Sequence, residues 1–188
     1  MNNDNANLQS ALDGVLSTYR AAFSEKVYNE ENEDHDVLMD VFGITPQLKR
    51  ENRQYWGREL GMCWQRLVVE VCRHMHADFG PAIRIGSDEP CDLTVGKLAI
   101  DTKYRIGSGD SGTLKKFKAY GPLLRSKSFE PVLLIVREDN LDAAITACHA
   151  GGWTVTTGPR SFEYLMQLTG FDVRGFLLQR TNAFPVSR

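Results

Sequence analysis

The chain has 188 residues, of which 42% are hydrophobic and 24% are charged, and its formal net charge at pH 7 is −2. These values are typical of one soluble globular domain. No apolar run approaches the ~18 residues that a membrane span needs, and the first nine residues lack the features of a signal peptide. The sequence therefore excludes a membrane-spanning segment, and we expect a cytoplasmic protein with no membrane partner.

The N-terminal part of the chain has the spacing of helices. Leu8 to Phe23 is amphipathic, and the acidic stretch from residue 29 to residue 36 is expected to be a solvated loop. The clearest helix is Gln54 to Ala77, where large apolar residues recur on one face. Phe79-Gly80-Pro81 is expected to end this helix.

The pattern then changes to strands bounded by Gly, Pro and Asp, which are expected at 82–85, 93–95, 98–106 and 132–136. Thr113 to Ser126 is helical in character, although Gly121-Pro122 should break or kink it. Helices are expected at 141–150, 161–168 and 173–178, with a strand at 153–157. This order predicts an α/β fold with a mixed central β-sheet flanked by helices. We divide the single domain into an N-terminal helix and acidic loop (1–53), a core (54–168) and a C-terminal extension (169–188).

The cysteines and histidines do not form a metal-binding pattern. A zinc site usually contains close ligand pairs, and neither residue type has them here. We interpret the four cysteines as reduced and structural; they are Cys63, Cys72, Cys91 and Cys148.

Charge is distributed unevenly along the chain. Met1 to Phe42 contains nine acidic residues and two basic ones, whereas Tyr104 to Lys127 contains six basic residues and one acidic one. A basic segment on a nearly neutral chain indicates a surface that faces a polyanion such as DNA. An ordinary solvated face explains the basic run equally well.

The segment from Asp92 to Arg105 carries the chemistry. Gly96-Lys97 fits a two-residue hairpin turn of type II′, which pairs Val95 with Leu98 and so places Asp92 opposite Asp101. Alternation along the second strand puts Asp101, Lys103 and Arg105 on one face. Two carboxylates this close repel each other unless a cation lies between them.

This arrangement suits the hydrolysis of a phosphodiester bond. Carboxylate oxygens bind Mg²⁺, which completes its shell with water and phosphate. A lysine two residues after the second carboxylate can orient or deprotonate the attacking water and offset phosphate charge. The alternative is a surface hairpin with an ordinary Asp–Lys ion pair.

The pattern resembles the PD-(D/E)xK nuclease superfamily, and within it the type II restriction endonucleases. Asp101-Thr102-Lys103 matches the second half of the family motif and Asp92 matches its first Asp, although Cys91 separates Asp92 from Pro90. The resemblance covers about residues 54–168. It implies a Mg²⁺ site formed by Asp92, Asp101 and the Thr102 backbone carbonyl, with Lys103 positioning the water.

The family often adds a glutamate from the helix that precedes the hairpin. Here Gln65 occupies the usual position of that glutamate. Glu59 and Glu70 lie on nearly the same helical azimuth, and either could substitute. We leave the fourth ligand open among these three residues.

The region after the second strand commonly contacts DNA in this family. Arg105 is a candidate phosphate contact, and the glycine-rich loop and the helix after it carry further candidates: Ser108, Asp110, Ser111, Thr113, Lys115, Lys116 and Lys118. Gly107 to Gly112 also matches the G-x-G-x-x-G pattern of dinucleotide-binding folds. The charged face of the preceding strand argues against that alternative, because the first strand of such folds is nearly all apolar.

The sequence therefore predicts a Mg²⁺-dependent, sequence-specific endonuclease that cuts double-stranded DNA as a homodimer. The interface could come from the helix at 8–23 or from the helices between 161 and 178. The alternatives are a structure-specific repair or recombination nuclease of the same superfamily, a nucleotide-binding α/β domain, and a catalytically inactive DNA-binding module.

Overall fold

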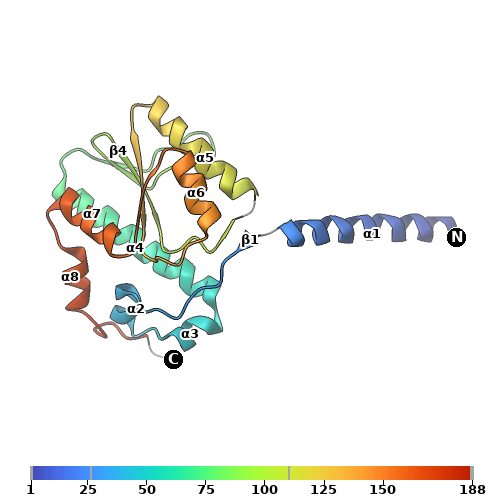
Figure 1. Ribbon diagram of the computed structural model, residues 1–188, viewed down its shortest axis with the longest axis horizontal. Coiled ribbons are helices and arrows are strands. Elements are labelled where there is room, and N and C mark those ends of the chain that lie inside the picture. Colours follow the sequence, from blue (N-terminus) through green and yellow to red (C-terminus); the bar gives the residue numbers. More distant parts are fainter. Residues whose placement is uncertain (1, 26, 110, 187–188) are drawn as a thin grey trace.

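The computed structural model describes residues 2–25, 27–109 and 111–186 (Figure 1). Its centre is a five-stranded mixed sheet with strand order β2-β3-β4-β6-β7. The strands are β2 Phe79–Pro81, β3 Leu93–Val95, β4 Leu98–Lys103, β6 Glu130–Ile135 and β7 Thr154–Thr157. Neighbours from β2 to β4 are antiparallel, and those from β4 to β7 are parallel. The predicted α/β fold with a mixed sheet is confirmed.

Helices cover both faces of this sheet. One face packs against α4 (Arg53–Met75), α7 (Pro159–Thr169), α8 (Val173–Leu178) and the short α2 (Val37–Phe42); the other packs against α5 (Ser111–Ser126) and α6 (Asp142–Ala150). A further short helix, α3, spans Pro46–Glu51. Alternation along β4 separates the two cores, because Ile100 lies in the α4 core and Ala99 in the α5–α6 core. Asp101 and Lys103 consequently share the α5–α6 side with Ala99.

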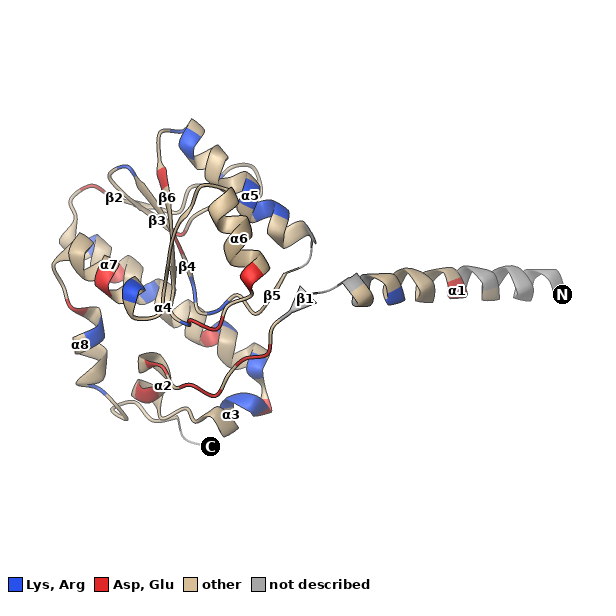
Figure 2. Cartoon of the chain, viewed as in Figure 1, with Lys and Arg blue, Asp and Glu red and all other residues tan. Residues whose placement is uncertain are grey.

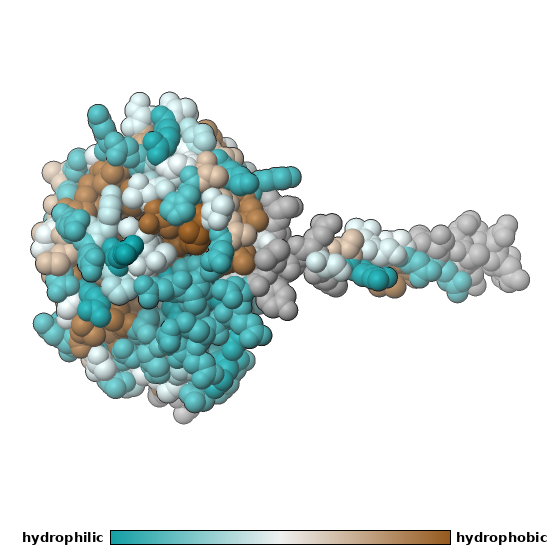
Figure 3. All heavy atoms as spheres, viewed as in Figure 1, coloured by the Kyte–Doolittle hydropathy of each residue, from teal (hydrophilic) through white to brown (hydrophobic). Residues whose placement is uncertain are grey.

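Helix α1 (Asn2–Glu25) lies outside this body and points away from it (Figure 1; Figure 3). It confirms the helix predicted at 8–23. The short strand β1 (Val27–Tyr28) follows α1 and pairs with β5 (Ser108–Gly109), a ribbon that the sequence did not indicate. In the part of the chain that the structure describes, no helix is long and apolar enough to cross a membrane.

Two strand boundaries differ from the predicted ones. The edge strand is β2 at Phe79–Pro81 and not 82–85, because residues 79–81 pair with Leu93–Val95 as soon as α4 has ended. Pro81 is compatible with this place, since an edge strand tolerates a missing N–H. Strand β4 stops at Lys103, three residues before the predicted end at Ile106.

A break or a kink was predicted at Gly121-Pro122; the break does not occur, and α5 continues through Pro122 to Ser126. Close packing against the end of α6 explains why glycine stands at position 121 within the helix. A Cβ atom at Gly121 would lie 1.8 Å from the carbonyl oxygen of Gly151, so only glycine lets the two segments come this close. The burial gained by this contact outweighs the poor helix propensity of the dipeptide.

Candidate active site

The β3–β4 hairpin brings the two predicted carboxylates together. Gly96 has φ +54°, as the first turn position of a type II′ turn requires, and Val95 pairs with Leu98. The regular ladder ends at the pair Leu93 and Ile100, and the N–H of Asp92 donates to the Ile100 carbonyl at 2.8 Å. Asp92 therefore lies at the open end of the hairpin, one residue before β3. It is not paired with Asp101 in the regular ladder.

The carboxylate of Asp92 is held by three donors. Oδ2 accepts from the backbone N–H of Thr102 at 2.7 Å and from its hydroxyl at 2.6 Å, and Oδ1 accepts from the Gln65 amide at 2.8 Å. These bonds come from two separate elements, β4 and α4. They fix the carboxylate in one orientation beside Asp101.

Asp101 and Lys103 form the other half of the cluster. Lys103 Nζ lies 2.6 Å from Asp101 Oδ2 and donates to the Thr102 carbonyl at 3.1 Å. Burial raises the pKa of Asp101 to about 6; Lys103 opposes this effect, and Asp92 adds to it. Burial works against the charge of Lys103, but the carboxylates of Asp101 and Asp92 outweigh it and raise the pKa of the lysine. Lys103 is therefore a cation in this arrangement.

The donor set around Lys103 fits a hard divalent cation. The ammonium already bonds to two of the three oxygen groups expected to hold the metal, the Asp101 carboxylate and the Thr102 carbonyl. Across the described ranges, no group of three or more His, Cys, Asp or Glu side chains is arranged to hold a metal ion. An ion bound here would thus have two carboxylates and a carbonyl from the protein. Mg²⁺ accepts such a set, because it keeps several waters and takes substrate phosphate as a ligand.

The three candidates for the fourth metal ligand differ in whether they reach the cluster. Gln65 reaches the cluster, since its amide bonds to Asp92. Glu59 pairs with Arg58, and Glu70 pairs with Arg73; both glutamates are about half exposed. The structure thus brings Gln65 to the site and leaves Glu59 and Glu70 in surface ion pairs.

A cavity of about 380 Å³ opens over Asp101 and Lys103. Its walls include the predicted DNA contacts Thr113 and Lys116. Lys116 Nζ lies 3.3 Å from Oδ1 of Asp88, which also lines the cavity. Lys115 and Lys118 are exposed on the same helix, α5, where Figure 2 shows a concentration of basic residues. Asp110 lies outside the described residues, as does the side chain of Ser111.

Arg105 and Ser108 are not in this cavity. Strand β4 ends at Lys103. The alternation of side chains along the strand therefore does not place Arg105 on the same face as Lys103. The guanidinium of Arg105 instead bonds to Asp139 at 3.1 Å and to the Asn29 carbonyl at 2.8 Å. Arg105 and Ser108 line a separate cavity beside α4. The shared face predicted for Arg105 is therefore wrong, and its contact with DNA stays a prediction.

The glycine-rich segment does not adopt the geometry of a dinucleotide-binding turn. In such folds the glycine-rich turn joins a buried strand directly to a helix. Here Ser108 and Gly109 form β5 and pair with Tyr28 and Val27. This pairing gives the segment a structural role.

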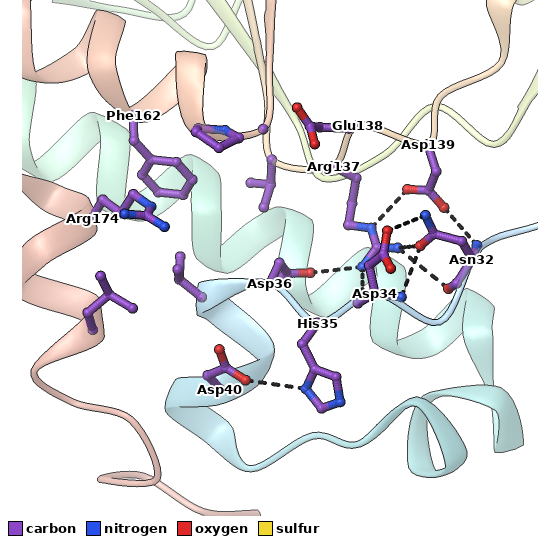
Figure 4. Close-up of a pocket in the computed structure, with 15 residues that line it drawn as sticks. Asn32, Asp34, His35, Asp36, Asp40, Arg137, Glu138, Asp139, Phe162 and Arg174 are labelled. Carbon is purple, nitrogen blue, oxygen red and sulfur yellow. Dashed lines mark hydrogen bonds and ion pairs between the residues drawn. The ribbon is translucent and has the colours of Figure 1, made fainter.

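A second polar cluster, which the sequence did not reveal, lies beyond the end of β6 (Figure 4). The side chain of Arg137 is 3% exposed and bonds to Asp139, to Asp36 and to Asn32. Lys49, also buried, donates to Tyr104 at 2.6 Å and bonds to Glu31. The stretch 29–36 is a largely exposed loop, as predicted, but Glu31, Asn32 and Asp36 also anchor it to the body of the protein.

No family model, curated protein or solved structure matches the chain.

Proposed function

We propose that this protein is a Mg²⁺-dependent endonuclease that hydrolyses phosphodiester bonds of double-stranded DNA, in the manner of type II restriction enzymes. The observation that carries the proposal is the cluster of Asp92, Asp101 and the Thr102 carbonyl around the Lys103 ammonium. The mixed sheet supports it, because the hairpin that carries the cluster leads into the central strand β4. The basic surface of α5 beside the cavity is suited to the phosphates of DNA.

Each residue of the cluster has a defined task in this reaction. Asp92, Asp101 and the Thr102 carbonyl would hold Mg²⁺, which polarises the phosphate and makes water a better nucleophile. The oxygen of water forms a bond to phosphorus while the bond from phosphorus to the leaving sugar oxygen breaks; the attacking water releases a proton to solvent, and the leaving oxygen takes one from solvent. Lys103 orients this water and, as a cation, stabilises the charge that builds up on the phosphate oxygens. Gln65 keeps Asp92 in position.

The cavity over the cluster fits the substrate better than the cavity beside Arg137. That second cavity, of about 290 Å³, is lined by Arg137 and Arg174 but also by Asp34, Asp36, Asp40, Glu138 and Asp139. Figure 4 shows Asp36 and Asp139 directed toward Arg137. An excess of carboxylates repels a polyanion. The cavity over the cluster has the smaller excess, three carboxylates against two lysines, and a bound Mg²⁺ would offset it, so we place DNA over Asp101 and Lys103.

Incubation of supercoiled plasmid with the protein, first with Mg²⁺ and then with EDTA, tests the proposal. We expect discrete fragments with Mg²⁺ and intact plasmid with EDTA. A smear, or a preference for branched DNA, would favour a repair or recombination nuclease of the same superfamily. An intact plasmid under both conditions would contradict nuclease activity.

A single substitution then tests the site. Lys103→Ala should retain DNA binding in a gel-shift assay and lose cleavage. The matched control is Lys97→Ala, which removes an exposed lysine from the turn of the same hairpin and should cleave normally. Full cleavage by Lys103→Ala would remove Lys103 from the mechanism.

Double-strand cleavage also favours a symmetric dimer. A palindromic site presents the same bonds on both strands, and a two-fold axis brings one active site to each. The homodimer is accordingly part of the proposal.

A further inference from the structure

Helix α1 is a poor helix by itself. It has 24 residues, about 36 Å at 1.5 Å per residue, and shows no extensive packing against another described element. Gly14 in its interior costs roughly 1 kcal/mol relative to alanine. Thr18 and Ser24 bond back to carbonyls four residues earlier, which does not favour a helix. Since most helical stability comes from the packing of an apolar face, α1 needs a surface to pack against.

One face of α1 is suited to such packing. Four large apolar side chains lie at helical spacing and are between 52% and 66% exposed; they are Leu12, Val15, Leu16 and Tyr19. An apolar stripe of this kind marks a protein interaction site. Asp13 and Arg20 are seven residues apart, so they lie on the same flank of the stripe.

We propose that α1 pairs with α1 of a second copy of this chain, in antiparallel orientation, about a two-fold axis close to Leu16. In this arrangement Val15 lies beside Leu16 of the partner subunit, and Leu12 lies beside Tyr19 of the partner subunit. The stripe is therefore complementary to itself, as a two-fold interface requires.

The charged residues select the orientation. In an antiparallel pair, the flank of one helix that carries Asp13 and Arg20 faces the same flank of the other helix. Asp13 then lies next to Arg20 of the partner subunit on both sides of the two-fold axis. A parallel pair brings opposite flanks together and leaves Asp13 and Arg20 apart. Charge complementarity thus favours the antiparallel pair.

The C-terminal helices are less suited to this role. Phe162 and Leu165 of α7 and Val173 and Leu177 of α8 are buried in the protein's own core. This region also exposes Met166, Phe171 and Leu178, but they are distributed over α7, the turn after it and α8, whereas those of α1 recur at helical spacing on one helix. The inference deepens the proposed dimer but does not depend on nuclease activity, because its test measures mass and not cleavage.

Sedimentation equilibrium of the full chain tests the pairing. We expect a dimer for the wild-type protein and a monomer for Leu16→Glu. The matched control, Ser17→Glu, places the same charge on the opposite side of α1 and should remain a dimer. Tryptophan fluorescence should be unchanged in both variants, since the three tryptophans, Trp56, Trp64 and Trp153, are buried in the body and not in α1. A monomeric wild type would overturn the proposal.

Charge reversal tests the orientation. Asp13→Arg and Arg20→Asp should each weaken the dimer by roughly 3- to 10-fold, because each places like charges together at two symmetric positions. The double variant restores opposite charges and should recover wild-type affinity. Failure to recover would exclude the antiparallel pair.

The outer face of α4, which exposes Met62, is the competing surface for α1. If α1 docked there, Met62→Glu would dissociate the dimer and the double charge variant would not recover. The antiparallel pair predicts that Met62→Glu leaves the dimer intact.

Discussion

The two polar clusters near the ends of β4 and β6 differ in charge balance. The cluster beyond β6 contains three cations and three carboxylates that pair with one another: Lys49 with Glu31, Arg105 with Asp139, and Arg137 with both Asp139 and Asp36. The cluster on β4 contains two carboxylates, Asp92 and Asp101, and one cation, Lys103.

This difference separates a structural role from a chemical one. A balanced, buried network holds chain segments together and has no need of a further ion. Both clusters border a cavity, but the β4 cluster has an excess of negative charge among its own members, so it can accept another cation and a phosphate. Substitutions in each cluster and a pH titration test this contrast.

Asp101→Asn should abolish cleavage with little loss of fold. The amide removes the charge that would hold the metal, and we expect cleavage to fall by about 10³-fold or more. The same change relieves the buried carboxylate, so thermal stability without metal should be equal or higher. A plasmid-cleavage time course and a thermal melt measure the two effects. Normal cleavage by the variant would remove Asp101 from the site.

Arg137→Met should lower the stability of the fold, because it leaves buried carboxylates without their cation. We expect a loss of about 3–5 kcal/mol in the free energy of unfolding. Urea denaturation at pH 7 measures it. The control is Arg174→Met, which removes an exposed arginine that lines the cavity beside Arg137. Equal stability of the two variants would contradict a structural role for Arg137.

The metal-free protein should lose stability as the pH rises. Burial raises the pKa of Asp101 to about 6 in the folded state, whereas the unfolded value is 3.8. Between these values the folded protein keeps a proton that the unfolded chain has released, so stability falls as pH increases through this range. The total loss is about 3 kcal/mol.

Urea denaturation in EDTA between pH 4 and pH 8 checks this dependence, with Asp101→Asn as the reference. The difference between the two proteins should grow from about pH 4 and level off above about pH 6. Addition of Mg²⁺ at high pH should recover stability in the wild type alone. Parallel curves for the two proteins would count against the raised pKa.

Gln65→Ala should weaken the site without destroying it. The amide orients Asp92 but does not carry charge, and removal of such a supporting bond typically costs 10- to 100-fold in metal affinity or activity. The Mg²⁺ concentration needed for half-maximal cleavage measures the effect. Glu70→Ala, in a surface ion pair of the same helix, is the control and should behave as wild type.

The part of the site that could be predicted is local in sequence. A two-residue turn fixes the register of the hairpin, so Asp92, Asp101 and Lys103 could be placed near one another from spacing alone. Spacing placed side chains correctly only as far as the end of β4. Alternation holds only within a strand, and Arg105, beyond that end, turns to Asp139 instead.

The contacts that could not be predicted join distant parts of the chain. Arg137 and Asp36 are 101 residues apart, and no local pattern links them. Gln65 and Asp92 are 27 residues apart, and helical spacing could not separate Gln65 from Glu59 and Glu70. In both cases the packing of helices against the sheet decides which side chains meet.

Anomalous diffraction from crystals of the wild-type protein grown with Mn²⁺ tests whether Asp92 and Asp101 hold a divalent metal ion. We expect one strong peak between the carboxylates of Asp92 and Asp101 and next to the Thr102 carbonyl, with the Lys103 ammonium displaced from its bond to Asp101. The absence of a peak at this position, or a peak among the carboxylates around Arg137 instead, would contradict the assignment of the metal site to β4.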